Sequence, residues 1–242
     1  MAVPYNFEKV LEQFTKEIKS LFGKGTLSIT VFGSAATDEF DPQKSDINFL
    51  VVLTQKAIHQ IDKALPFVSK WERRRISLPL FVTKEYIQAS LDSFPIEFIN
   101  MQSAYKVIQG EDVLGSLKFK KKDIRLACER ELKGKLLHLR QSYLLTKGRI
   151  HALRQLIKES LVTFISIFKA LLYLKGIAIQ PTKQEVLLDV CHEFKLDEGL
   201  FSVLMAVRSE GVQLSKSAYE KKCLRYISEI EKLTELIDKI KV

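Results

Sequence analysis

The sequence predicts an α+β protein: an N-terminal domain with a mixed sheet, residues 1–115, followed by an all-α helix bundle, residues 116–242. Three observations predict this arrangement. Strand-like and helix-like runs alternate in the first half. The second half contains long runs with apolar residues at helical spacing. Most of the excess positive charge lies near the junction of the two halves. With 46% hydrophobic and 28% charged residues, the 242-residue chain has the composition of a folded globular protein.

Short runs rich in β-branched and aromatic residues predict the strands of the first half. These strands are expected at residues 27–32, 47–53, 76–82, 94–99 and 105–108. Helices are expected from a cap at Asn6 to about residue 22, from 54 to 71, and from 83 to 91. The strand at 47–53 should bury Ile47 and Phe49, because alternate side chains of a strand face opposite sides of the sheet.

The second half should consist of helices alone. They are expected at residues 123–146 and 150–175, from a capping box at Thr182 onward, and at 196–207 and 215–241. The most apolar run, residues 161–174, is too short to span a bilayer and contains Lys169. We therefore expect a cytoplasmic protein without a membrane partner, whose oligomeric state the sequence leaves open.

Positive charge is concentrated in one segment. Residues 116–150 carry 11 basic and 3 acidic side chains, a net charge of +8, whereas the whole chain has +9. A local positive field attracts polyanions, so the basic segment 118–149 could hold a nucleoside triphosphate, an anionic acceptor or nucleic acid. The alternative is a solvated helix face with internal pairs such as Glu129–Lys133.

The most informative stretch joins two expected strands. Gly33 and Ser34 end the strand at 27–32, and Asp46-Ile47-Asn48 opens the next strand eleven residues later. Asp46 and Asn48 are two residues apart, so both side chains project from one face of that strand. Gly33 lets a phosphate approach the backbone, and Ser34 adds a hydroxyl donor. The alternative is an ordinary strand–turn–strand hairpin.

Residues 31–53 resemble the nucleotidyltransferase (DNA polymerase β-like) superfamily. Its pattern is an apolar residue, Gly-Ser or Gly-Gly, a loop, then Asp-x-Asp or Asp-x-Glu on a strand, with a third carboxylate from a later strand. The runs 95–99, 105–112 and 131–143 resemble a group of bacterial and archaeal nucleotidyltransferase-domain proteins. The helical second half is similar to the arrangement in kanamycin nucleotidyltransferase and its relatives.

The resemblance implies an activity and a set of site residues. The activity is transfer of a nucleoside monophosphate from a triphosphate such as ATP to an acceptor hydroxyl of unknown identity, with Mg²⁺ or Mn²⁺. Gly33 and Ser34 would hold the phosphates. Asp46, Asn48 and Glu97 would ligate the metal ions, with Asp46 and Glu97 as the catalytic carboxylates.

One position departs from this pattern. Residue 48 is Asn, whose carbonyl can ligate Mg²⁺ but supplies no negative charge. The second interpretation is therefore a catalytically degenerate protein that keeps the fold and acts as a nucleotide-binding or interaction module.

A run of three arginines, Arg73 to Arg75, precedes the strand expected at 76–82. Three adjacent arginines could bind phosphate, but consecutive residues of a helix cannot all share one face, so we expect this run to be a solvated helix end.

Overall fold

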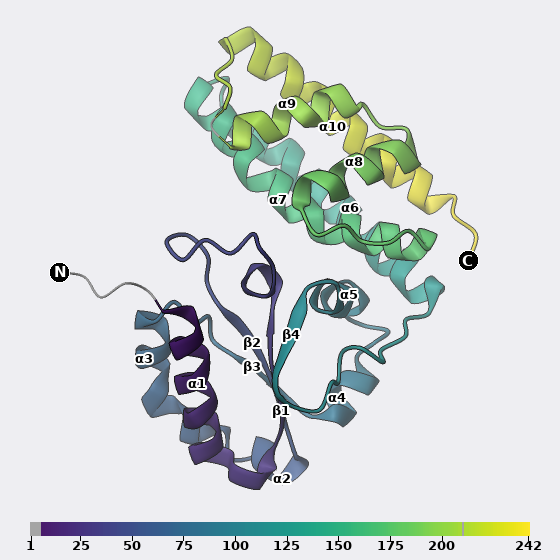
Figure 1. The fold of residues 1–242 in the computed structure, drawn as a ribbon. Helices are drawn as coiled ribbons and strands as arrows, with labels where there is room; N and C mark the ends of the chain where they lie inside the picture. Colours follow the sequence, from purple (N-terminus) through teal and green to yellow (C-terminus); the bar gives the residue numbers. More distant parts are fainter. Residues whose placement is uncertain (1–5, 210) are drawn as a thin grey trace, which may run out of the picture. The chain divides into compact units, whose positions relative to one another are not determined.

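The structure is a computed structural model that describes residues 6–209 and 211–242. The chain forms two compact units. The first contains the described residues through Leu91 together with Asn100–Lys118, and the second contains Asp92–Ile99 and Phe119–Val242. The first unit is a sheet with helices and the second is entirely helical, which confirms the predicted α+β class (Figure 1).

A four-stranded mixed sheet forms the centre of the first unit. Its strands are β1 (Thr26–Phe32), β2 (Asn48–Leu53), β3 (Leu80–Val82) and β4 (Tyr105–Gly110), in the order β3-β2-β1-β4. β1 runs antiparallel to both β2 and β4, whereas β3 runs parallel to β2. The end of β1 therefore lies beside the beginning of β2, with Phe32 opposite Asn48.

Helix α1 (Phe7–Phe22) covers one face of this sheet (Figure 1). The side chain of Asn6 caps it as predicted, accepting from the Lys9 amide at 2.9 Å. Its apolar stripe packs on alternate residues of β1 and β2, and the rings of Phe14 and Phe49 stack with centroids 3.9 Å apart. Ile47 and Phe49 are buried in this core, which confirms the predicted orientation of that strand.

The segment between β2 and β3 is less regular than predicted. In place of one helix at 54–71 there are α2 (Gln55–Ile58), the 3₁₀ helix η3 (Ile61–Phe67) and α3 (Val68–Arg73). Pro66 lies inside η3, and a proline cannot donate the hydrogen bond that an α-helix needs. The strand expected at 76–82 is limited to β3 and one isolated bridge between Ile47 and Ile76.

The prediction of a strand at 94–99 is wrong. These residues begin helix α5 (Pro95–Ser103), which follows the short α4 (Lys84–Ala89). Proline is well suited to the first position of a helix because its fixed φ is helical and its missing amide proton is not needed there. Ile96 and Ile99, three residues apart, are buried in the core of the second unit.

Five helices form the main part of the second unit. They are α6 (Lys121–Leu145), α7 (Ile150–Lys175), α8 (Lys183–Phe194), α9 (Glu198–Arg208) and α10 (Lys216–Asp238). Gly176 ends α7 with a φ of 73°, and Thr182 and Glu185 form the predicted capping box of α8. The core contains the three cysteines, Cys128, Cys191 and Cys223, all unpaired and buried.

Within the two described stretches, no helix is both long enough and apolar enough to cross a bilayer.

Candidate functional site

The turn that follows β1 has a backbone suited to glycine. Gly33 has a φ of 76° and begins the 3₁₀ helix η2 (Gly33–Ala36). A residue with a Cβ is strained at this φ. The Gly33 amide donates to the Ala104 carbonyl at 2.8 Å, so this N–H is already used within the fold. Gly33 therefore contributes its left-handed backbone and its lack of a side chain to the site, and not a free amide donor.

Ser34 supplies the polar group of this turn. Its carbonyl accepts from the Thr37 amide at 3.0 Å and from the Thr37 hydroxyl at 3.1 Å, which holds the turn closed. Its own hydroxyl makes no hydrogen bond to any part of the chain that the structure describes. The side chain is only half-buried, so this hydroxyl can donate to a ligand oxygen.

Asp46 and Asn48 lie on the sheet face opposite α1. The side chain of Asp46 is 60% exposed, and Asn48 is half-buried, whereas Ile47 between them is fully buried on the other face. A Cβ placed on Gly33 would lie 3.5 Å from the Asn48 amide nitrogen. The structure thus brings the glycine turn and the Asp46–Asn48 pair together at one end of the sheet, where residue 32 pairs with residue 48.

Arg75 is a member of this site that sequence reasoning missed. Its Nε lies 3.5 Å from Oδ1 of Asp46, and its Nη1 donates to the carbonyl of Pro42 at 3.4 Å and to that of Gln43. The guanidinium thus reaches the loop between Ser34 and Asp46 at two places. The expectation of a solvated helix end was wrong for this residue, because α3 ends at Arg73 and Arg75 has left the helix with a φ of 59°.

Arg74 also differs from the expected solvated arginine. Its Nη1 lies 3.0 Å from Oε1 of Glu17, which in addition accepts from Lys70 and, through Oε2, from the Trp71 indole at 2.8 Å. Burial raises the pKa of Glu17, but the hydrogen bonds from Lys70, Trp71 and Arg74 outweigh burial and hold the pKa below its usual value. This cluster joins α1 to α3 behind the site and is structural.

Glu97, the expected third carboxylate, lies on helix α5 and not on a strand. Its side chain is exposed between the buried Ile96 and Phe98, in the part of α5 that belongs to the helical unit. The segment parallel to β2, residues 76–82, contains no acidic residue. Among the residues that the structure describes, no group of three or more His, Cys, Asp or Glu side chains could hold a metal ion.

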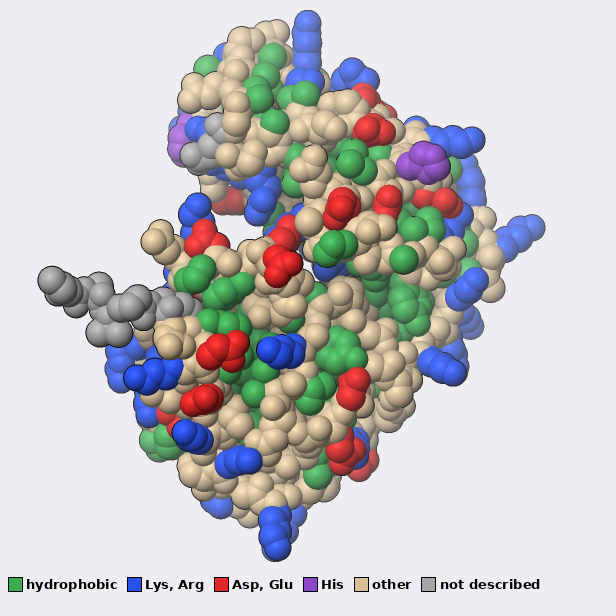
Figure 2. Space-filling model, viewed as in Figure 1, with side chains coloured by type: hydrophobic (Ala, Val, Ile, Leu, Met, Phe, Trp, Pro, Cys, Tyr) green, Lys and Arg blue, Asp and Glu red, His purple; other side chains and the backbone are tan. Residues whose placement is uncertain are grey.

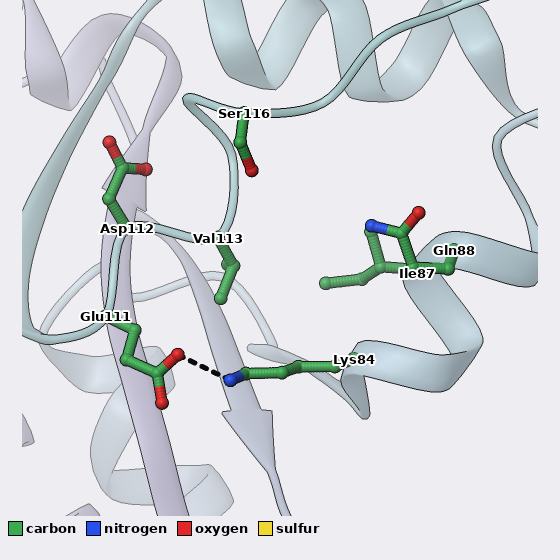
Figure 3. Close-up of a pocket in the computed structure, with 7 residues that line it drawn as sticks. All are labelled: Lys84, Ile87, Gln88, Glu111, Asp112, Val113 and Ser116. Atoms are coloured by element: carbon green, nitrogen blue, oxygen red, sulfur yellow. Dashed lines mark hydrogen bonds and ion pairs between the residues drawn. The ribbon is translucent and has the colours of Figure 1, made fainter.

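A separate hollow of about 220 Å³ lies at the end of β4 in the first unit (Figure 3). Lys84 of α4 reaches across it to the carboxylate of Glu111. The neighbouring Asp112 accepts from the amides of Gly115 at 2.8 Å and Leu114 at 3.1 Å, and from the Tyr105 hydroxyl at 2.9 Å. The Gly115 bond is the main cause of its lowered pKa. These bonds close the loop after β4, so the acids here have a structural role.

Comparisons with known proteins identify the family of the first domain and a structure with a similar fold. Residues 11–107 match the family described as nucleotidyltransferase domain. The fold is similar to that of a spectinomycin adenyltransferase from Enterococcus faecialis, whose structure contains ATP and spectinomycin, with a TM-score of 0.55 and 14% identity. That alignment covers 97% of this chain and 100% of the other. None of the curated proteins matches the sequence. The chain therefore contains a nucleotidyltransferase domain at residues 11–107, followed by a helical C-terminal region.

Proposed function

We propose that the first unit binds a nucleoside triphosphate such as ATP and transfers its nucleoside monophosphate to an acceptor hydroxyl. The observation that carries this proposal is that a Cβ on Gly33 would lie 3.5 Å from the Asn48 side chain, so the glycine turn lies against the beginning of β2, next to Asp46. Ser34 donates its hydroxyl to a phosphate oxygen. Asn48, the first residue of β2, and Asp46, two residues before it, present oxygen donors beside this turn.

The donor set at Asp46 and Asn48 fits one hard divalent cation. A carboxylate and an amide carbonyl are oxygen ligands of the kind that Mg²⁺ and Mn²⁺ prefer. When bound, such an ion neutralises charge on the phosphates. Glu97, the third carboxylate that the resemblance implies, lies in the helical unit, and its role as a ligand stays a prediction. Because Asn48 is neutral, Asp46 is the one anionic ligand of this pair.

A second candidate function is nucleotide binding without turnover. Two observations favour it: Asn48 stands where the superfamily pattern has a carboxylate, and Asp46 is paired with the guanidinium of Arg75. With one carboxylate engaged and the second absent, the site attracts a divalent cation less strongly than one that carries two free carboxylates. Such a protein would act as a nucleotide sensor or interaction module.

ATP labelled at the α-phosphate, with Mg²⁺ or Mn²⁺, separates the two candidates. Label transferred to the protein or to an acceptor, and lost in Asp46→Asn, supports the transferase. ATP binding without transfer, with transfer gained in Asn48→Asp, supports the degenerate candidate. The matched control is Asp62→Asn, which removes an exposed acid from η3. If neither the wild type nor Asn48→Asp binds ATP, both candidates are rejected.

For the acceptor, we propose an anionic compound held by the basic segment 118–149. Many of its cations have acidic partners in the structure, among them Arg125 with Glu129 and Arg140 with Glu231. Figure 2 likewise shows Lys and Arg side chains spread over the visible face, with Asp and Glu among them. The lysines at 118 and 120–122, at the beginning of α6, are the part of the segment best placed to hold an anion.

Nucleic acid is the second partner proposed for this segment. A steep fall in RNA or DNA affinity with rising salt, reduced when Lys120–Lys122 are changed to Gln, would support it. Absence of binding at low salt would reject it.

A further inference from the structure

Arg75 is held in an uncommon backbone conformation beside the proposed site. Its φ of 59° lies in the left-handed region, which a residue with a Cβ rarely adopts. Its amide donates to the Glu72 carbonyl at 2.9 Å, and its carbonyl accepts from the Ile47 amide at 2.8 Å. This second bond belongs to the bridge between residues 47 and 76 at the beginning of β2. These two hydrogen bonds fix the backbone of Arg75 beside Ile47, the residue that follows Asp46. The Arg75 side chain therefore begins close to Asp46.

The side chain of Arg75 uses this position to join three points of the loop that ends at Asp46. Its Nε faces Oδ1 of Asp46 at 3.5 Å, and its Nη1 contacts the carbonyl oxygens of Pro42 and Gln43. The guanidinium is 36% exposed and the Asp46 side chain 60% exposed, so both are partly open to solvent. An exposed ion pair of this kind exchanges partners readily, because its net stabilisation is small.

The same carboxylate is the anionic ligand that the proposed function requires. A divalent cation on Asp46 would lie next to the Arg75 guanidinium, and the two positive charges would repel each other. We propose that Arg75 competes with the divalent cation for Asp46: the guanidinium holds the carboxylate while the site is empty, and it moves to a phosphate oxygen when a nucleoside triphosphate and its cation enter. This inference rests on the assignment of Asp46 as a metal ligand in the proposed function.

Binding of Mn²⁺ alone, followed by electron paramagnetic resonance without any nucleotide, tests the competition. Arg75→Asn removes the charge and suits the left-handed backbone, and Arg75→Gln is a second uncharged variant. Both should bind Mn²⁺ about tenfold more tightly than the wild type, since one like charge a few ångströms away is removed. Arg75→Lys keeps the charge and should stay close to the wild type.

The matched control is Arg73→Gln, which removes an exposed charge two residues away that makes no hydrogen bond or ion pair with any described residue. It should leave Mn²⁺ affinity unchanged. Asp46→Asn should abolish the gain in the uncharged Arg75 variants, because the competition is for that carboxylate. Circular dichroism and Trp71 fluorescence of each variant show that the sheet unit is folded.

Binding of ATP with the divalent cations chelated tests the second half of the exchange. Arg75→Asn and Arg75→Gln, which lack the guanidinium, should bind ATP about tenfold more weakly than the wild type. This effect is opposite to the tighter Mn²⁺ binding expected of the same variants. Equal Mn²⁺ affinity in the wild type and in both uncharged variants, including no binding by any of them, would overturn the proposal. Tighter Mn²⁺ binding with no ATP binding by any variant would instead uphold the competition for Asp46, overturn the transfer to phosphate and reject the nucleotide site.

Discussion

Gly33 and Gly176 have nearly the same φ in very different surroundings. Their φ values are 76° and 73°, but a Cβ on Gly33 would lie 3.5 Å from the Asn48 side chain, whereas a Cβ on Gly176 would meet nothing within 4 Å. A left-handed alanine costs about 1 kcal/mol at either position. Gly33→Ala should therefore lower the free energy of unfolding by about this amount and also weaken ATP binding, as measured by denaturant titration and calorimetry.

Gly176→Ala is the matched control for this prediction. It should lower stability by a similar amount, because the strain is the same, but it should leave ATP affinity unaltered. Equal ATP affinity in the wild type and in a folded Gly33→Ala protein would argue that the turn after β1 does not approach a phosphate.

The residues of the candidate site differ in how well the sequence predicts them. Gly33 and Ser34 directly follow β1, and Asp46 and Asn48 stand at the beginning of β2, which pairs with β1. The pattern of the two strands is therefore enough to place all four residues at one end of the sheet. Arg75 could not be found this way. Its position depends on a left-handed backbone and on a parallel bridge to Ile47, and neither leaves a periodic signal in the sequence. The role of Glu97 stays a prediction.

At the scale of elements, Glu17 joins α1 to α3. Its carboxylate is 12% exposed and accepts from Lys70, Trp71 and Arg74. Burial raises its pKa, but the hydrogen bonds from these three donors outweigh burial, so the pKa of Glu17 in the folded state lies below its usual value. A lowered pKa stabilises the fold at pH values above the unfolded pKa, and this stabilisation is lost as the pH falls through the folded one.

Glu17→Gln should therefore destabilise the first unit by about 1–2 kcal/mol at neutral pH, since it leaves charged donors poorly paired. The difference from the wild type should shrink as the pH falls through the lowered folded-state pKa of Glu17, below which both proteins carry a neutral side chain. Urea unfolding followed by Trp71 fluorescence at several pH values measures this. Glu12→Gln, an exposed acid on the same helix, is the control. A constant difference across the pH range would contradict the assignment.

The capping box of α8 gives a prediction for the helical unit. The Thr182 hydroxyl accepts from the Glu185 amide at 3.2 Å, and the Glu185 carboxylate accepts from the Thr182 amide at 3.2 Å. Thr182→Ala removes one of these partners and should cost about 1 kcal/mol of stability. Thermal unfolding followed by circular dichroism measures the loss. Thr182→Ser, which keeps the hydroxyl, should retain most of the stability of the wild type. A loss of stability as large as that of Thr182→Ala would show that the hydroxyl cap does not stabilise the helix.

Element types followed from local patterns wherever one signal dominated. Caps and glycine stops predicted α1, α7 and α8, and runs rich in β-branched and aromatic residues predicted β1 and β2. Residues 94–99 misled because a short apolar run with one charge fits a strand as well as a helix. The packing of Ile96 and Ile99 into the core of the helical unit favours a helix over a strand here. Such a contact between distant segments of the sequence cannot be predicted from local spacing.

At the scale of the whole molecule, the two units contain different reporters. The single tryptophan, Trp71, is buried in the core of the sheet unit, and all three cysteines are buried in the core of the helical unit. Burial raises the pKa of each thiol to about 12, so little thiolate is available to react in the folded protein. Trp71 fluorescence therefore reports unfolding of the first unit, and thiol labelling reports unfolding of the second.

Nucleotide binding should act on these two reporters unequally. A ligand at Gly33, Ser34 and Asp46 stabilises the unit that binds it, by about 2.7 kcal/mol at a hundred times its dissociation constant. ATP should move the Trp71 transition to higher urea concentration and leave the thiol-labelling transition in place, because the two cores are separate clusters. An equal shift of both would mean that the units unfold together. A shift of the thiol transition alone would place the nucleotide on the helical unit and contradict the proposed site.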